Sequence, residues 1–198
     1  MSSVGLDKVD VLRKMALDIN PECQITVFPS GINLENISEF LEDVDIVCDG
    51  LDLYASHLRT PLYEQAHKQG CYIVSAGPFG MGTGHVAFHP QKMGFNEYFD
   101  LDHEGLTVEA KIIRFLAGMS PHFLHQSYVA YPQAVALFEG RLPSLHAGCY
   151  SASAALSSTV LKIVLQRGKV LYAPRGFQID FYRNKYKKFW RPFGNKNP

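Results

Sequence analysis

The chain has 198 residues, of which 46% are hydrophobic, 12% aromatic and 19% charged, and its formal net charge is zero. This composition excludes an intrinsically disordered chain, a collagen-like fibre and a disulfide scaffold. The best membrane-span candidate, residues 152–165, is interrupted by three serines, a threonine and a lysine, so we expect no membrane-spanning helix. The first residues do not resemble a signal peptide, and we expect a cytoplasmic protein.

The zero net charge hides a strong asymmetry along the chain. Residues 1–110 contain 17 acidic and 6 basic side chains, whereas residues 111–198 contain 2 acidic and 13 basic ones. Charge of this kind bears on association rather than on fold. We therefore expect each half to attract either the other half or a partner of opposite charge.

The four cysteines, Cys23, Cys48, Cys71 and Cys149, stand singly, and none belongs to a C-x-x-C pair. A common structural zinc site needs such pairs, so we expect no zinc. Free cysteine is among the most buried residue types, and we expect these four to be buried thiols.

The first 76 residues predict helices that alternate with strands. Apolar residues at helical spacing predict helices over residues 7–20, 33–41 and 54–69, and short apolar runs predict strands over 24–28, 45–49 and 71–76. Pro21 ends the first helix and Gly70 ends the third. Alternation of this kind favours crossover units and a mostly parallel sheet.

The pattern changes after residue 76. Residues 77–84 are rich in glycine but lack the G-x-G-x-x-G order, so we expect a tight turn rather than a phosphate loop. A strand over 85–89, an irregular aromatic stretch over 90–105, and helices over 106–119 and 149–166 follow. The tail predicts an antiparallel hairpin that turns at Arg183 and Asn184.

Acidic residues follow the second predicted strand. Residues 45–52 run from a buried strand into Asp49 and Asp52, at the edge where open α/β sheets bind ligands. Asp52 could hold a magnesium ion that bridges phosphates. The alternative is that either aspartate only caps the helix that begins near Tyr54.

Several of these segments together resemble the ThiF/MoeB/HesA family, the ATP-dependent activators of ubiquitin-like carrier proteins. The matching segments are residues 8–12, 19–21 with Val27, 45–52 with Arg59, and 72–76 with Gly80 and Gly82. The resemblance implies an α/β fold with a Rossmann-like parallel sheet that lacks its first strands and glycine loop and has a C-terminal helical and β-hairpin region. Residues 1–90 would form a partial nucleotide-binding core, and residues 91–198 the C-terminal helices and hairpin of the same domain.

The resemblance also implies a chemistry. Family members bind Mg-ATP and adenylate the C-terminal carboxylate of a ubiquitin-like or sulfur-carrier protein. Lys8 matches the lysine that contacts the ATP phosphates, and Asp52 matches the aspartate that holds the catalytic magnesium. Asp49 is the first aspartate of the same D-x-x-D stretch and is expected to take part in cofactor binding, whereas Arg59 is expected to have a structural role at the head of its helix.

The chain departs from the family pattern in several respects. Leu53 stands where members usually have asparagine, the paired zinc cysteines are absent, and no cysteine matches the transfer thiol. The strand, glycine loop and S-N-x-x-R segment that precede the lysine in the family have no counterpart. We therefore expect a chain that is inactive alone, or one completed by a partner chain or a second copy.

Other readings of the sequence stay open. His85 and His89, or His122 and His125, lack a third ligand for a metal site, and we expect Cys149 to pack in its helix rather than to react with His146. The basic, aromatic tail over residues 162–198 would suit nucleic acid, although a packed hairpin explains its aromatics better. A non-catalytic scaffold subunit is the alternative that we favour over a nucleic-acid-binding module.

Overall fold

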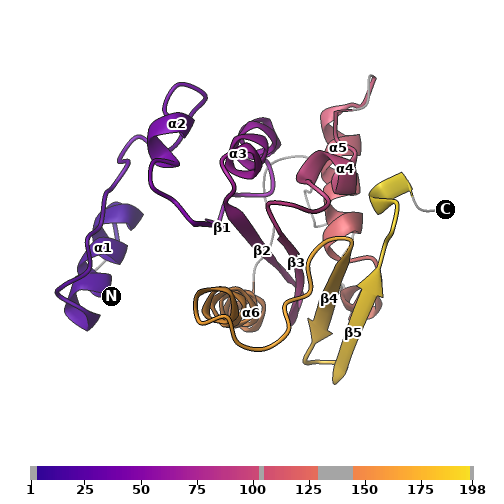
Figure 1. Ribbon diagram of the computed structural model, residues 1–198. Coiled ribbons are helices and arrows are strands. Elements are labelled where there is room, and N and C mark those ends of the chain that lie inside the picture. Colours follow the sequence, from indigo (N-terminus) through magenta and orange to yellow (C-terminus); the bar gives the residue numbers. More distant parts are fainter. Residues whose placement is uncertain (1–3, 103–104, 129–144, 197–198) are drawn as a thin grey trace. The chain divides into compact units, whose positions relative to one another are not determined.

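The computed structural model describes residues 4–102, 105–128 and 145–196 (Figure 1). Contacts divide the chain into two compact units, residues 1–40 and 41–198. The predicted division at residue 90 lies within the second unit and stays a prediction.

The first unit contains the helices α1 (Lys8–Ile19) and α2 (Ile37–Phe40). The strand expected over residues 24–28 does not form, and this prediction was wrong. An alternating sequence becomes a strand only where a neighbouring strand completes its hydrogen bonds, and the described residues provide none there. Phe28 instead packs edge-on against Phe40, with 5.5 Å between the ring centroids.

A five-stranded sheet forms the centre of the second unit. Its strands, in order across the sheet, are β1 (Ile46–Asp49), β2 (Tyr72–Phe79), β3 (Gly82–Phe88), β4 (Arg175–Asp180) and β5 (Lys185–Trp190). β1 and β2 are parallel and are joined through α3 (Ser56–Lys68), whereas the later neighbours pair antiparallel. The α/β fold is thus confirmed, but the sheet, which was expected to be mostly parallel apart from its terminal hairpin, is parallel only between β1 and β2.

The glycine-rich segment forms the tight turn that was predicted, together with parts of two strands. β2 and β3 form a hairpin around Gly80 and Met81, and Gly80 has φ of +57°. A Cβ atom on Gly82 would collide with the carbonyl oxygen of Ile179 in β4. Because the turn is so short, β3 must run antiparallel to β2.

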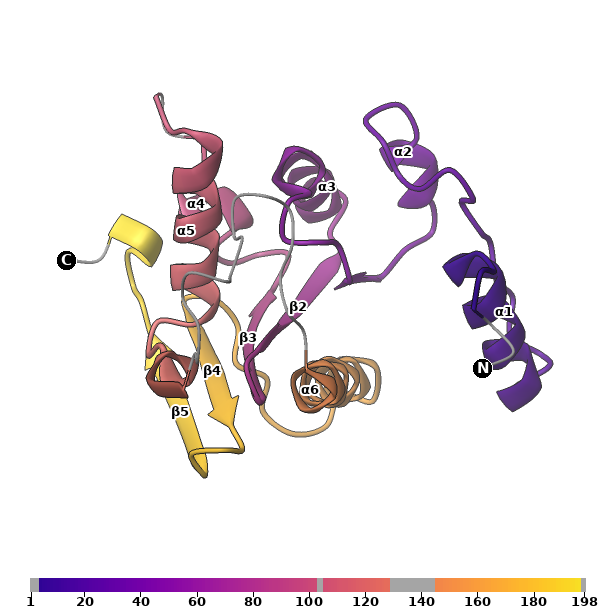
Figure 2. The same ribbon diagram turned by 180° about the vertical axis from the view of Figure 1, so that it is seen from behind.

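Helices cover both faces of this sheet (Figures 1 and 2). One face carries α3, α4 (Phe95–Phe99) and α5 (Val108–Met119), and the other carries α6 (His146–Val164). The first face contains an aromatic core in which Phe88 of β3 contacts Tyr63 of α3 and Phe95 and Phe99 of α4. Short 3-10 helices follow α5 and β5, η1 (Leu124–Tyr128) and η3 (Gly194–Lys196).

The terminal hairpin is confirmed by the pairing of β4 and β5. Before β4, Tyr172 forms an isolated bridge to Ala87. The hairpin leaves Trp190 62% exposed, with the Arg175 guanidinium 5.8 Å from its ring. Among the described helices, none combines the length and the apolar character needed to cross a lipid bilayer.

The cysteines differ from the expectation of buried thiols. Only Cys71 is buried, and its Sγ donates to the Val44 carbonyl at 2.9 Å, whereas Cys23, Cys48 and Cys149 are exposed. Cys149 was expected to pack within its helix, and this was wrong. The buried stripe of α6 falls on other positions, Gly148, Ser151, Ala152, Ala155 and Thr159.

Candidate functional site at the carboxyl end of β1

The carboxyl end of β1 holds a buried acidic side chain. Asp49, the last residue of β1, is 7% exposed. Its Oδ2 accepts hydrogen bonds from Arg59 Nε at 3.0 Å, Tyr63 OH at 2.6 Å and Ser75 Oγ at 3.0 Å. Burial and the neighbouring Asp49 carboxylate raise the pKa of Tyr63 well above its usual value, so the phenol stays a donor. The Asp49 charge is therefore neutralised inside the protein.

Arg59 also holds the backbone that follows β1. This arginine, 2% exposed, donates from Nη2 to the carbonyls of Leu51 at 2.7 Å and Asp52 at 3.0 Å. The Leu51 amide donates to Asp49 Oδ1 at 2.9 Å, which closes a ring of contacts around the loop. The guanidinium fork suits such a set of acceptors. Arg59 thus has the structural role expected of it.

Asp52, unlike Asp49, lies at the protein surface. Its side chain is exposed, and Oδ1 accepts from the Tyr54 amide at 3.3 Å. The N-cap of α3 is Ala55, which has no side-chain cap, so neither aspartate caps this helix directly. Among the described residues, no lysine or arginine forms an ion pair with Asp52.

The Asp52 carboxylate could supply one ligand to a magnesium ion. In the described part of the chain, no three His, Cys, Asp or Glu side chains gather where they could hold a metal alone. Mg²⁺ commonly takes one or two carboxylates and completes its shell with water and substrate phosphates. A single exposed carboxylate such as Asp52 matches that donor set.

Lys8 and Asp49 were also predicted to take part in the site. Lys8 is exposed at the start of α1, in the first unit, so its proximity to Asp52 stays a prediction. Both carboxylate oxygens of Asp49 are already engaged within the protein. The role of Asp49 in cofactor binding also stays a prediction, and its contacts suit a positioning role.

The sequence did not identify Tyr63 and Ser75 as partners of Asp49. Ser75 lies opposite Asp49 in the β1–β2 register, and Tyr63 lies one helical turn after Arg59. The i to i+4 spacing of Arg59 and Tyr63 was visible in the sequence, whereas the strand register was not.

The histidines considered as metal ligands or as a partner of Cys149 have other neighbours. His85 is buried, whereas the His89 ring lies against Tyr72 and Tyr172 at 5.1 Å in each case. His146 stacks on Tyr150, with the ring centroids 5.7 Å apart.

Two curated proteins match short parts of this chain. The "Probable molybdopterin-synthase adenylyltransferase" of Pyropia yezoensis is 37% identical over 51 residues, which are 26% of this chain and 14% of that protein. The protein of the same name from Porphyra purpurea is 32% identical over 56 residues, which are 28% of this chain and 15% of that protein.

Solved structures match nearly the whole chain in fold. E. coli MccB with ATP superposes with a TM-score of 0.62 at 16% identity, over 98% of this chain and 49% of MccB. The selenomethionine form of PaaA superposes with a TM-score of 0.62 at 13% identity, over 96% of this chain and 57% of PaaA. The chain therefore spans about half the length of these solved chains. A ThiF family model matches residues 1–198, and the chain belongs to the ThiF family.

Proposed function

We propose that this chain contributes part of a site that uses Mg-ATP to adenylate the C-terminal carboxylate of a ubiquitin-like or sulfur-carrier protein. Membership of the ThiF family and the names of the curated relatives support this class of reaction. The observation that carries the proposal is Asp52, an exposed carboxylate at the carboxyl end of a parallel strand. Ligands of open α/β sheets bind at that edge.

The side chains of this edge would divide the work. Asp52 holds the magnesium ion, and Arg59 keeps the Asp52 backbone in place through its carbonyl. Asp49 positions Arg59, and Lys8 contacts the phosphates. When bound, Mg-ATP supplies the adenylyl group that is transferred to the carrier carboxylate.

The cradle for the phosphates would come from residues outside this sequence. In the described residues, the glycine-rich segment forms the β2–β3 hairpin, with no helix after it to offer free amides to an anion. Among the residues that the structure describes, β1 has a strand neighbour on one side only, so this sheet edge can accept another strand. Another part of a longer polypeptide, a partner chain or a second copy would complete the site there.

Calorimetric titration with Mg-ATP tests the role of Asp52. We expect weak, magnesium-dependent binding, with a Kd of roughly millimolar, that Asp52→Asn abolishes because the ion loses its protein ligand. Asp45→Asn is the matched control, since Asp45 is an exposed aspartate just before the other end of β1. Equal loss in both variants would point to overall charge and would count against the proposal.

The same titration separates the scaffold alternative. A non-catalytic subunit would keep the fold and its partner surface without nucleotide, so neither wild type nor Asp52→Asn would bind ATP at millimolar concentration. Circular dichroism of both proteins shows whether the fold is retained.

A further inference from the structure

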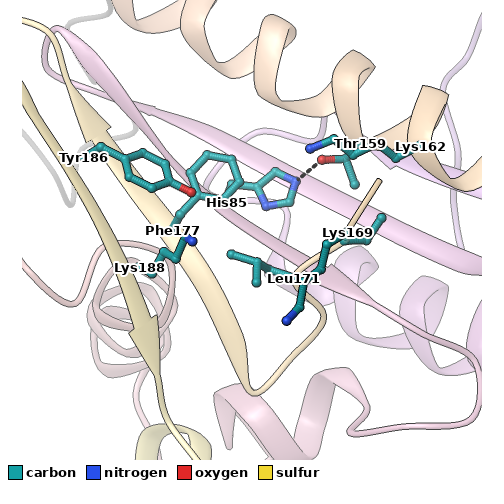
Figure 3. A pocket seen from close by; sticks show the side chains of 9 residues that line it. His85, Thr159, Lys162, Lys169, Leu171, Phe177, Tyr186 and Lys188 are labelled. Carbon is teal, nitrogen blue, oxygen red and sulfur yellow. Dashed lines mark hydrogen bonds between the residues drawn. The ribbon is translucent and has the colours of Figure 1, made fainter. Parts of the chain in front are cut away.

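A pocket lies on the α6 face of the sheet (Figure 3). Asp49 shares its face with Ser75, whereas His85 pairs with the next residue, Ala76, and so points to the opposite face. The pocket has a volume of about 230 Å³, far above the roughly 10–15 Å³ that one water needs. Residues from five segments line it, among them His85, Thr159, Lys162, Lys169, Phe177 and Lys188.

The orientation of His85 leaves one ring nitrogen without a partner. The ring is 1% exposed and stacks on Phe177, with the centroids 4.5 Å apart and the planes at 13°. Its Nε2 lies 3.0 Å from Thr159 Oγ1. Its Nδ1 is buried and has no hydrogen-bond partner among the described residues. Figure 3 shows this ring within the pocket, above Leu171 and Lys169.

The hydrogen bonds of Thr159 favour one tautomer of His85. When the Thr159 hydroxyl donates its single proton to the Ala155 carbonyl at 2.9 Å, its oxygen accepts from His85 Nε2–H at 3.0 Å. We assign this tautomer to His85. In it, His85 Nδ1 carries a lone pair that can accept a hydrogen bond from a ligand in the pocket.

The His85 ring stays neutral near neutral pH. Burial, opposed in part by the backbone of His85 and reinforced by the positive charge of Lys162, lowers the pKa of His85 to about 4. A ligand in the pocket thus meets an acceptor at Nδ1 rather than a cation. A buried acceptor without a partner is costly, and a ligand that donates a proton removes that cost.

The pocket is also positively charged. Lys162, Lys169 and Lys188 line it, and the described lining contains no carboxylate. The lysines favour an anion, while Nδ1 favours a group that carries a hydrogen. A phosphate group that retains one proton satisfies both conditions, whereas sulfate and carboxylates, which have no proton at this pH, satisfy only the first.

We propose that this pocket binds a phosphate group that keeps at least one proton, either as free orthophosphate or as a phosphomonoester, with its hydroxyl donating to His85 Nδ1 and its oxygens facing the three lysines. The proposal does not depend on ATP binding at Asp52, because the pocket lies on the α6 face of the sheet, whereas Asp52 lies in the loop beyond the carboxyl end of β1.

Calorimetry of the full chain at pH 6.0, with ionic strength held constant by potassium chloride, tests the ligand. The probes are orthophosphate, methyl phosphate and sulfate. At this pH about half of a phosphomonoester keeps its proton, and His85 is neutral. We expect saturable binding of phosphate and at least roughly tenfold weaker binding of sulfate, because a proton-free ion leaves Nδ1 unpaired. Methyl phosphate that binds like orthophosphate identifies esters as ligands, and its failure to bind identifies the free ion.

Two neighbouring lysines provide a matched pair of variants. Lys188 lines the pocket, whereas Lys187 lies on the other face of β5. Lys188→Ala should weaken phosphate binding about three- to tenfold, and Lys187→Ala less than about twofold. Phosphate should also shift the NMR signal of His85 Nδ1 in the wild type, which a diffuse surface charge would not do.

Three results would overturn the proposal. The first is no saturable phosphate binding at up to about 10 mM, which would leave a water as the occupant of the pocket. The second is equal affinity for sulfate and phosphate. The third is an equal effect of the two lysine variants.

Discussion

Two aspartates three positions apart end in opposite environments. Asp49 lies inside the protein, bound by Arg59, Tyr63 and Ser75, whereas Asp52 lies in solvent. The sequence predicted acidic side chains at this edge. It could not separate their roles, because the difference depends on the β1–β2 register and on a guanidinium ten residues further along the chain.

Replacing Arg59 should show how strongly the buried Asp49 carboxylate destabilises the protein when its cation is missing. Arg59→Met leaves Asp49 as a buried charge without its cation, and we expect it to lower the free energy of unfolding by about 3–5 kcal/mol. The measurement is urea denaturation followed by circular dichroism.

Lys68→Met is the control for this substitution, since Lys68 is an exposed cation of the same helix. It should change stability by less than about 0.5 kcal/mol. Similar losses in the two variants would show that the buried ion pair has no special weight.

At the scale of elements, the predictions that succeeded rest on local patterns. The helix that became α3 shows apolar spacing and an ending at Gly70, and the terminal hairpin shows alternation around Asn184. The strand expected over residues 24–28 failed because its pairing depends on distant residues. The direction of β3 was also not apparent, since it follows from a turn of only two residues.

The approach of β3 to β4 depends on the absence of a side chain at Gly82. We expect Gly82→Ala to destabilise the protein by about 1–3 kcal/mol or more, because the methyl group meets the Ile179 backbone oxygen rather than a flexible side chain. Thermal denaturation measures the effect.

Gly50→Ala is a suitable comparison, since a Cβ there meets no atom within 4 Å and the backbone does not have positive φ. Its melting temperature should stay close to that of the wild type. A Gly82→Ala protein with an unchanged melting temperature would mean that β3 and β4 can separate at no cost.

At the scale of the whole molecule, few of the charges in the acidic and basic halves form ion pairs with each other. Among the described residues, the ion pairs between the acidic and basic halves are those of Arg114 and Lys196 with Asp100. The lysines around the His85 pocket have no carboxylate in its described lining. Composition indicated the asymmetry, but which charges meet could be learned only from the fold.

The division into two units predicts that residues 41–198 fold without residues 1–40. All five strands and the aromatic core lie within this part. A chain of residues 41–198 should show cooperative thermal unfolding and retain phosphate binding, while it loses Lys8. A chain of residues 1–170, which lacks β4 and β5, should not unfold cooperatively. A noncooperative 41–198 chain would show that the first unit is needed for folding.

Trp190 is the only tryptophan of the sequence, and its position on β5 has a practical consequence for spectroscopy. The emission maximum of an indole that is already largely exposed to water shifts little when a protein unfolds. Tryptophan fluorescence will therefore report poorly on the aromatic core. Because Trp190 lies on the same face of β5 as Lys188, its fluorescence is instead a natural reporter of the surface that borders the lysine-rich pocket.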